Sequence, residues 1–309
     1  MKAHPRLAIG LPVRNGEQYL PQAAASLLSQ TYADFRLLIA DNASTDATPE
    51  IGRELARRDS RVTYVRHEEN IGAAPNFNFA FRETRGEYFK WAAHDDLCEP
   101  RFLERCIETL DADRGVVLCH SYSNWVDATG SIVGPARRDP RVASERPGER
   151  FIAALKQGYP ALIWGVMRRD AAAAAGLIPS FVGSDRYFLA GLLLRGRAAL
   201  VPEYLFSVRK HDESFTDNFY RLTHRARRSW FDPRMRLNGL SGMTMTTARL
   251  VRLLATDRYT MRDRAACAVY LGRRLGGFLR HRALETAALA FGDPAHASRG
   301  RGGVSEASR

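Results

Sequence analysis

The stretch LAIGLPVRNGEQYL (residues 7–20) starts as an apolar run and changes directly into a helical pattern. The run at 7–13 predicts a buried strand, and apolar side chains at helical spacing predict a helix over 17–29. The same alternation continues with predicted strands at 35–40, 62–66 and 87–93 and helical patterns between them. It predicts an α/β fold with a Rossmann-like, mostly parallel sheet flanked by helices.

The remaining chain is divided by its composition. The polar, proline-containing region 134–149 predicts a surface loop. A helix is predicted over 184–196, followed by strand pieces at 198–202 and 204–209, and the sequence after 217 has a helical pattern. We therefore expect an α/β domain at 1–215, a helical, basic C-terminal extension at 216–296 and a disordered tail at 297–309.

Composition limits the class of protein. The chain has 309 residues, 45% of them hydrophobic, which is enough for the core of one large domain. No stretch approaches the ~20 apolar residues of a membrane-spanning helix, and the start MKAHPRLAIGLPV lacks the features of a secretory signal. The four cysteines have no C-x-x-C spacing, so we expect reduced thiols in a cytoplasmic protein, with neither a zinc site nor a disulfide framework.

The formal net charge is +12, and the sequence becomes rich in arginine from Arg221 onward. Such a region fits a polyanionic neighbour: an anionic membrane, a nucleic acid or an acidic glycan. Arginines beside Trp230, Phe231, Leu275 and Phe278 fit a helix lying on the inner face of the cell membrane. The alternatives are a solvated basic surface, or helices that complete the core or form a homodimer interface.

Four polar clusters follow predicted strands or open a predicted helix: PVRNGE, DNASTD, HDD and GSD. Ligands of open parallel sheets bind beyond the carboxyl ends of the strands, where loops converge. Each cluster alone is a weak signal of a site. Their placement at one edge of the same sheet predicts a ligand-binding site there.

Four segments together resemble family 2 glycosyltransferases of the GT-A fold, of the SpsA-like kind: LPVRNGEQYL, DNASTD, EYFKWAAHDD and SDRYFLAGLLLRG. The resemblance covers about residues 5–212. It implies an inverting enzyme with a nucleotide-sugar half at about 1–125 and an acceptor half at about 126–215. Its donor would be a nucleotide-diphosphate sugar, with UDP-sugars preferred. Its acceptor would be a glycan, a lipid-linked saccharide or a small molecule, as in cell-envelope polysaccharide or glycolipid synthesis.

The resemblance also implies which residues bind the nucleotide. Asp41 would accept the base N–H, and Pro12 and Asn15 would shape the nucleoside pocket, while Asn70 and Asn76 would lie close to the nucleotide. For Asp41 the alternative is a turn residue that caps the next helix. For Asn70 and Asn76 the alternative is a plain turn into a helix.

The adjacent carboxylates Asp95 and Asp96 cannot approach a diphosphate unaided, because the charges repel. A divalent cation reverses the sign of the interaction, and Mn²⁺ or Mg²⁺ suits oxygen ligands shared between protein and phosphate. The resemblance implies that Asp96 binds the metal and that His94 or Asp95 faces the ribose. His211 would be a further metal ligand or a donor to the leaving phosphate, a role for which Arg209 and Lys210 are alternatives. A solvated Asp-Asp turn before a helix is the remaining alternative.

Direct displacement with inversion requires one general base on the acceptor side. The resemblance assigns this role to Asp185, whose alternative role is to stabilise the start of its helix. Trp164 would stack on an acceptor sugar or belong to the core. Two other functions remain: a sugar nucleotidyltransferase, which would need a glycine-rich phosphate loop that GLPVRNGE does not supply, and a non-enzymatic basic protein that binds nucleic acid. The charge alone supports the latter, so no nucleic acid partner is expected.

Overall fold

The computed structural model describes residues 4–136, 140–156, 160–181, 183–211, 230–233, 239–255 and 259–291. Its first part follows the predicted alternation of strands and helices, with the predicted strand at 7–13 and the one at 62–66 at their expected limits. The elements are β1 (Leu7–Val13), α1 (Leu20–Leu28), β2 (Phe35–Asp41), α2 (Thr48–Arg58), β3 (Val62–Arg66), α3 (Ala73–Arg82) and β4 (Tyr88–Trp91).

The second part contains more elements than the sequence predicted. They are β5 (Leu97–Cys98), α4 (Phe102–Ala112), β6 (Val116–Val126), β7 (Ile132–Pro135), the 3-10 turn η1 (Pro140–Ala143), α5 (Pro147–Lys156), η2 (Pro160–Trp164), β8 (Val166–Arg168), α6 (Arg169–Ala175), α7 (Ser184–Leu193) and β9 (Arg197–Arg209). The prediction of a surface loop over 134–149 was wrong, because β7, η1 and the start of α5 occupy it and Val142 is buried.

The two strand pieces predicted after α7 are one strand, β9. Pro202 has no N–H to give to the ladder, which would usually interrupt a strand. Here the pairing with β6 shifts register between Ser121 and Tyr122, so that Val201 and Tyr204 pair with consecutive residues. The irregularity accommodates the proline, and the strand continues to the edge of the sheet where Arg209 lies.

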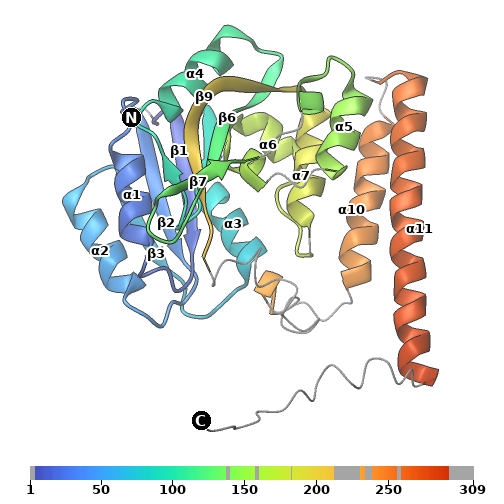
Figure 1. The fold of residues 1–309 in the computed structure, drawn as a ribbon, viewed down its shortest axis with the longest axis horizontal. Coiled ribbons are helices and arrows are strands. Elements are labelled where there is room, and N and C mark those ends of the chain that lie inside the picture. Colours follow the sequence, from blue (N-terminus) through green and yellow to red (C-terminus); the bar gives the residue numbers. More distant parts are fainter. Residues whose placement is uncertain are drawn as a thin grey trace, which may run out of the picture.

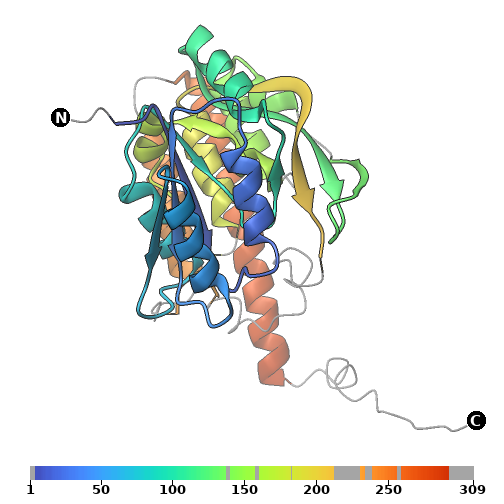
Figure 2. The same cartoon turned by 90° about the vertical axis from the view of Figure 1, so that its left-hand side faces the viewer.

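The described strands form one sheet in the order β3-β2-β1-β4-β8-β6-β9-β5, with β7 on β6. The pairings give β1, β2, β3, β4, β6 and β9 one common direction, and β5, β7 and β8 the opposite one. The strand order reverses between β1 and β4, and right-handed crossovers then place α3 on the face opposite α1 and α2. Helices therefore cover both faces of the sheet (Figures 1 and 2).

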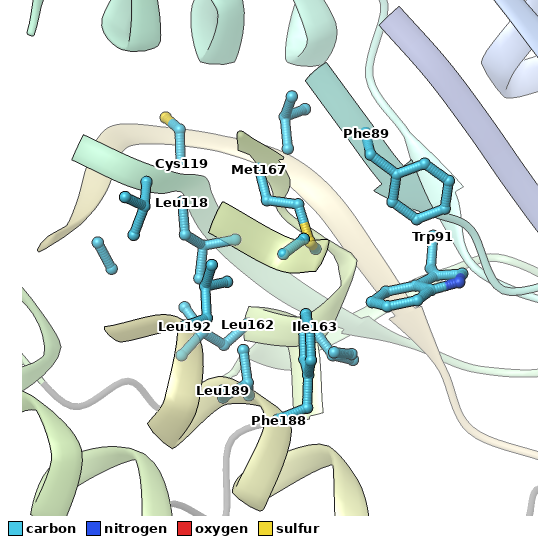
Figure 3. Packing of buried hydrophobic residues seen from close by; sticks show 14 of the residues in the cluster. Phe89, Trp91, Leu118, Cys119, Leu162, Ile163, Met167, Phe188, Leu189 and Leu192 are labelled. Carbon is cyan, nitrogen blue, oxygen red and sulfur yellow. The ribbon is translucent and has the colours of Figure 1, made fainter. Parts of the chain in front are cut away.

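The core lies mainly under β4, β6 and β8. Trp91 and Phe89 of β4 pack edge-to-face at 5.0 Å between ring centroids, and Phe188 of α7 packs on Trp91 at 5.2 Å. Figure 3 shows Leu189 and Leu192 of the same helix below Leu118 and Met167. Since α7 is held over its length by this contact, the position of its first turn is fixed relative to the sheet.

The described C-terminal helices are α10 (Gly239–Leu254) and α11 (Met261–Phe291), which lie side by side along α5 and α7 (Figure 1). Their buried residues, Leu250, Leu254, Cys267 and Leu271, join the same apolar cluster as the sheet. These helices confirm the predicted helical pattern over 239–254 and 261–291, whereas 217–229, 234–238 and the predicted tail lie outside the described residues. None of the helices within the described ranges combines the length and apolar character that crossing a membrane requires.

Arginine side chains from distant parts of the chain donate to carbonyls in the last turns of six helices. The pairs are Arg61 with Leu28 of α1, Arg169 with Phe81 of α3, Arg168 with Leu110 of α4, Arg274 with Leu155 of α5, Arg195 with Ala174 of α6 and Arg150 with Leu193 of α7. The last carbonyls of a helix have no partner within it, and a cation is favourable at that end. Part of the high arginine content therefore serves the fold.

Candidate active site at the switch point

The point where the strand order reverses brings together the loops after β1 and β4. Both strands end at the same edge, where ligands of such sheets bind. Gly16 of the first loop lies against His94 of the second, since a Cβ on Gly16 would be 2.8 Å from the His94 ring. The carboxyl ends of β2, β6 and β9 lie at this edge too, so three other segments can contribute to the site.

The loop after β1 is held by the loop after β2. Asn15 has a left-handed backbone (φ 54°), and its side-chain oxygen accepts the N–H of Thr45 at 2.9 Å. Its own N–H donates to Oγ of Ser44 at 2.9 Å. Pro12 is buried in β1 beside Ala40, while Asn15 is exposed. The structure thus places Asn15 at the surface of the edge and Pro12 beneath it.

Asp41 ends β2, is fully buried and uses both carboxylate oxygens within the chain. One accepts the N–H and the hydroxyl of Ser44 at 2.9 and 2.5 Å, and the other accepts the hydroxyl of Tyr64 at 2.6 Å. Nε of Arg66 is 3.7 Å away. Burial, together with the bond to Asp41, raises the pKa of Tyr64 above its ordinary value, which keeps this hydroxyl a donor. The alternative role of Asp41 as a turn residue is therefore present in the structure.

Asn70 and Asn76 connect the same edge to α3. The side-chain oxygen of Asn70 accepts from Asn42 at 2.8 Å and from the N–H of Gly72 at 2.9 Å. Asn76 is buried, donates to the carbonyl of Ala40 at 2.8 Å and lies 3.0 Å from Nε2 of His67. The amide of Asn76 is thus engaged inside the fold, whereas Asn70 shapes the turn before the helix.

The turn His94–Asp96, called the acidic turn below, holds two carboxylates with different surroundings. Asp96 is buried and accepts the N–H of Arg209 at 3.0 Å. Asp95 lies 3.0 Å from Nε2 of His211. Burial, followed by the charge of Asp95, raises the pKa of Asp96 well above its ordinary value. Burial alone would also raise the pKa of Asp95, but the hydrogen bond from His211 and the nearby His94 and His211 charges lower it. The two neighbouring carboxyls thus differ in the direction in which their surroundings shift the pKa.

His211 is next to the end of β9 and has a buried ring. Its Nε2 faces Asp95, and its Nδ1 is buried without a hydrogen-bond partner among the described residues. The ring packs 4.7 Å from that of Tyr19. A histidine with one ring nitrogen facing a carboxylate and the other without a partner has the chemistry of a potential cation ligand. Across the described ranges, however, no three acidic, histidine or cysteine side chains converge on one point.

Asp185 lies in the first turn of α7, after Gly183, which has a left-handed backbone (φ 76°). The short connection 194–196 joins the end of α7 to the start of β9, so α7 begins on the side where β9 ends. Burial raises the pKa of Asp185, against the opposing effects of the N–H and charge of Arg186 and the charge of Arg274. The structure thus supplies a half-buried carboxyl on the active-site side, on a helix fixed by the core.

Two charged residues near the site have positions and contacts that the sequence did not predict. Lys90 is fully buried in β4, its ammonium donates to the carbonyl of Trp164, and burial lowers its pKa. It lines a small cavity beneath the acidic turn together with Asp96.

The ring of Trp164 packs on Phe77 at 6.0 Å, which favours the core role over sugar stacking. The second charged residue is Arg209, which bonds to Gln22, Asp95 and Asp96, all more than 100 positions away in the sequence. A charged residue inside a predicted buried strand is the one sequence feature that could have indicated either charged residue.

Residues 8–158 match the family model for glycosyl transferase family 2. A curated relative, the putative glycosyltransferase EpsH of Bacillus subtilis (strain 168), is 28% identical over 211 residues, which are 67% of this chain and 56% of the relative. The chain thus spans little more than half the length of that relative.

Among solved structures, residues 1–349 of S. aureus TarS in complex with UDP-GlcNAc are similar with a TM-score of 0.63 and 16% identity. The match covers 88% of this chain and 73% of that one. The mannosyltransferase PcManGT of Pyrobaculum calidifontis, in complex with GDP-Man and Mn²⁺, is similar with a TM-score of 0.57 and 18% identity, covering 96% and 79%. These likenesses show that the chain has the predicted GT-A fold.

Proposed function

Residues 8–158 of this chain belong to glycosyl transferase family 2, and from that premise we propose that the protein transfers a sugar from a nucleotide-diphosphate donor to an acceptor hydroxyl. The observation that carries this function is the acidic turn at the switch point, where the buried Asp96 follows Asp95 and Asp95 lies 3.0 Å from the buried ring of His211. The acceptor is a glycan, a lipid-linked saccharide or a small molecule, as in cell-envelope polysaccharide or glycolipid synthesis. A nucleotidyltransferase has no supporting phosphate loop here.

We propose Mn²⁺ or Mg²⁺ as the cofactor. Mg²⁺ and similar ions bind proteins through one or two carboxylates together with substrate phosphates, so an all-protein cage is not required. Asp96 would hold the ion, and His211, with its orphaned Nδ1, would add a ligand or a phosphate contact. When bound, the ion supplies charge neutralisation for the departing nucleotide diphosphate. PcManGT was solved with Mn²⁺ and its donor, which supports this choice.

The donor nucleotide would lie over the ends of β1 and β2, between Asn15, Asp41 and Asn70. TarS was solved with UDP-GlcNAc and PcManGT with GDP-Man; for this chain we propose a UDP-sugar. His94 or Asp95 would face the ribose. The oxygen of Asp41 that bonds Tyr64 can accept a second N–H from a base, but Asp41 is fully buried, so the side chains that cover it would have to move for a base to reach it.

The reaction proposed is a single displacement with inversion. The acceptor oxygen forms a bond to the anomeric carbon while the bond from that carbon to the diphosphate oxygen breaks, and the acceptor proton passes to Asp185. A base works best when its pKa lies nearer the working pH than that of an exposed carboxyl, and the burial of Asp185 shifts its pKa in that direction. Asp96 and Asp185 thus have separate tasks, in donor binding and in proton transfer.

Calorimetric titration tests the donor proposal. We expect UDP-sugars to bind in the presence of Mn²⁺ and to bind at least about tenfold more weakly once EDTA removes it, because the ion compensates the charge between carboxylates and diphosphate. A thermal-shift screen with UDP- and GDP-sugars would show the same dependence as stabilisation by ligand. Equal affinity with and without the ion would remove the metal from the proposal, and no binding of any nucleotide sugar would remove the function.

We further propose that α11 makes peripheral contact with an anionic membrane. Met261, Val269 and Leu279 are exposed on it, and Arg262, Arg273 and Arg280 lie along the same stripe, opposite the buried Asp263, Cys267 and Leu271. Apolar and basic side chains in one exposed stripe suit the surface of an anionic bilayer. Phe231 and Leu275 do not take part as predicted, because both pack on the domain, and the side chain of Phe278 lies outside the described residues.

Vesicle flotation tests the membrane contact. We expect binding to vesicles with anionic lipid and a loss of about a hundredfold when Arg262, Arg273 and Arg280 are replaced by Gln, at about 1 kcal/mol for each charge. The control is the same replacement of Arg53, Arg57 and Arg58 on α2, which are also exposed. Equal recovery on neutral vesicles, or equal loss in both variants, would contradict the proposal. A dimer of the wild type that the α11 variant lacks would point to the homodimer interface instead.

A further inference from the structure

Arg209, the last residue of β9, connects four segments that meet at the active-site edge. Its Nε donates to the carbonyl of Asp95 at 2.8 Å, and its backbone N–H donates to the carboxylate of Asp96 at 3.0 Å. One terminal nitrogen donates to the carbonyls of Asp127 and Ala128 at 3.2 and 2.9 Å, in the turn between β6 and β7. The other donates to Gln22 of α1 at 2.6 Å.

These contacts commit four of the five N–H donors of the guanidinium to protein oxygens. Arg209 is 3% exposed, and its guanidinium lies 4.8 Å from the ring centre of Tyr19, which itself packs on His211. The sequence offered Arg209 as a donor to the leaving phosphate. The structure directs bonds from all three nitrogens to protein oxygens instead, so the guanidinium could offer a phosphate only its one remaining N–H without breaking this network.

We infer that Arg209 is a positioning residue, which fixes the acidic turn and His211 in the relative placement that metal-assisted donor binding requires. The inference rests on the proposed function for its purpose, and it assigns a role to a residue that touches no substrate. Arg209 fixes the main chain of Asp95 through Nε and the side chain of Asp96 through its own main chain. His211, two residues later, is thereby set at 3.0 Å from Asp95.

Only arginine can make this set of bonds. A guanidinium carries five N–H donors in a rigid plane, whereas an ammonium has three donors on a flexible stem. Lysine at this position would keep the positive charge near the carboxylates but could not reach Asp95, the 127–128 carbonyls and Gln22 together. Arg209→Lys therefore separates the geometry of the residue from its charge.

Arg150 provides a matched control for a purely structural role. It is 5% exposed and donates to the carbonyls of Leu193, Ser144 and Glu145 at 2.8 to 2.9 Å. Leu193 is the last residue of α7, next to the start of β9, so this arginine lies at the edge of the sheet opposite the site. A loss common to Arg150→Lys and Arg209→Lys reports on the fold, and a loss confined to the latter reports on the acidic turn.

The experiment compares the two variants by two measurements. Amide hydrogen exchange of the ligand-free protein should become faster at 94–98 and 126–130 in Arg209→Lys and remain at the wild-type rate there in Arg150→Lys. The affinity for Mn²⁺ in the presence of UDP is measured by titration, with the paramagnetic resonance signal of Mn²⁺ as the readout. It should be at least about tenfold weaker in Arg209→Lys and unchanged in Arg150→Lys. A loss of this size is found when residues that orient metal ligands are changed. Gln22→Ala changes an exposed residue and removes one acceptor of Arg209. It should also speed amide exchange and weaken the affinity for Mn²⁺ with UDP, but less than Arg209→Lys does.

Wild-type exchange at 94–98 in Arg209→Lys, or equal changes in both arginine variants, would overturn the positioning role. If Arg209→Lys does not fold, the amide exchange rate at 94–98 in Gln22→Ala, compared with the wild type, decides instead. If the wild type binds no Mn²⁺ with UDP, the proposed function fails, while hydrogen exchange still decides whether Arg209 holds the acidic turn.

Discussion

Asp185→Asn should leave donor binding unchanged and lower the rate of transfer by about a thousandfold, within the range that a general base contributes. The amide keeps the size of the side chain and its place in the first turn of α7, so the helix and the core beneath it should not change. It cannot take the acceptor proton. Single-turnover transfer, measured beside calorimetric donor affinity, separates the chemical step from binding.

Asp170→Asn is the matched control for this change, because Asp170 also lies in the first turn of its helix, α6, but is exposed. It should alter neither rate nor affinity. The pH profile supplies a second check: since burial raises the pKa of Asp185, the base is deprotonated only at a higher pH than an exposed aspartate. As the pH is lowered, the wild-type kcat/KM should therefore begin to fall while the pH is still above about 3.9, the ordinary pKa of an aspartate. Transfer by Asp185→Asn at the wild-type rate would show that the base is another residue.

Asp96→Asn should weaken metal-dependent donor binding by more than about a hundredfold, since even changes behind a metal ligand cost about ten- to a hundredfold. The amide oxygen can still accept the N–H of Arg209, so the acidic turn should keep its shape. What is lost is the negative charge that attracts the cation. The measurement is UDP affinity with and without Mn²⁺, with the melting temperature recorded to confirm folding.

Asp113→Asn is the corresponding control. Asp113 precedes β6 at the opposite edge of the sheet, where it pairs with Arg197, and its loss should not affect donor affinity. The residual affinity of Asp96→Asn should no longer respond to Mn²⁺. If Asp96→Asn bound UDP and Mn²⁺ like the wild type, the metal would have to be held elsewhere, and the assignment of the acidic turn would be wrong.

Local sequence patterns predicted the half of the fold that consists of βα units. β1 and β2 are mostly buried apolar runs, β3 is a short β-branched and aromatic run, and each is followed by a helix, so that such units have one compact arrangement. β5 and β8 were missed because they have two and three residues, and their pairing with β9, β4 and β6 comes from the far end of the domain. Two or three residues are too few to show the hydrophobic periodicity of a strand, and they form one only by pairing with neighbouring strands.

The candidate site divides in the same way. Asp95, Asp96 and Asp185 could be predicted because each follows a strand or begins a helix, where a polar cluster is visible in the sequence. The pairing of Asp95 with His211 spans 116 positions, and the bond from Arg209 to Gln22 spans 187. No local pattern encodes such bonds, which arise only when the sheet brings the ends of β4, β6 and β9 together.

Each of the six helices whose last carbonyls receive an arginine from elsewhere is bonded at that end to another part of the domain, which opposes separate fraying. The partners are 21 to 119 positions apart, so opening one helix end breaks a contact with another part of the domain. Local opening is thereby coupled to global unfolding, and the domain should lose its helices in a single cooperative step rather than by progressive melting from their ends.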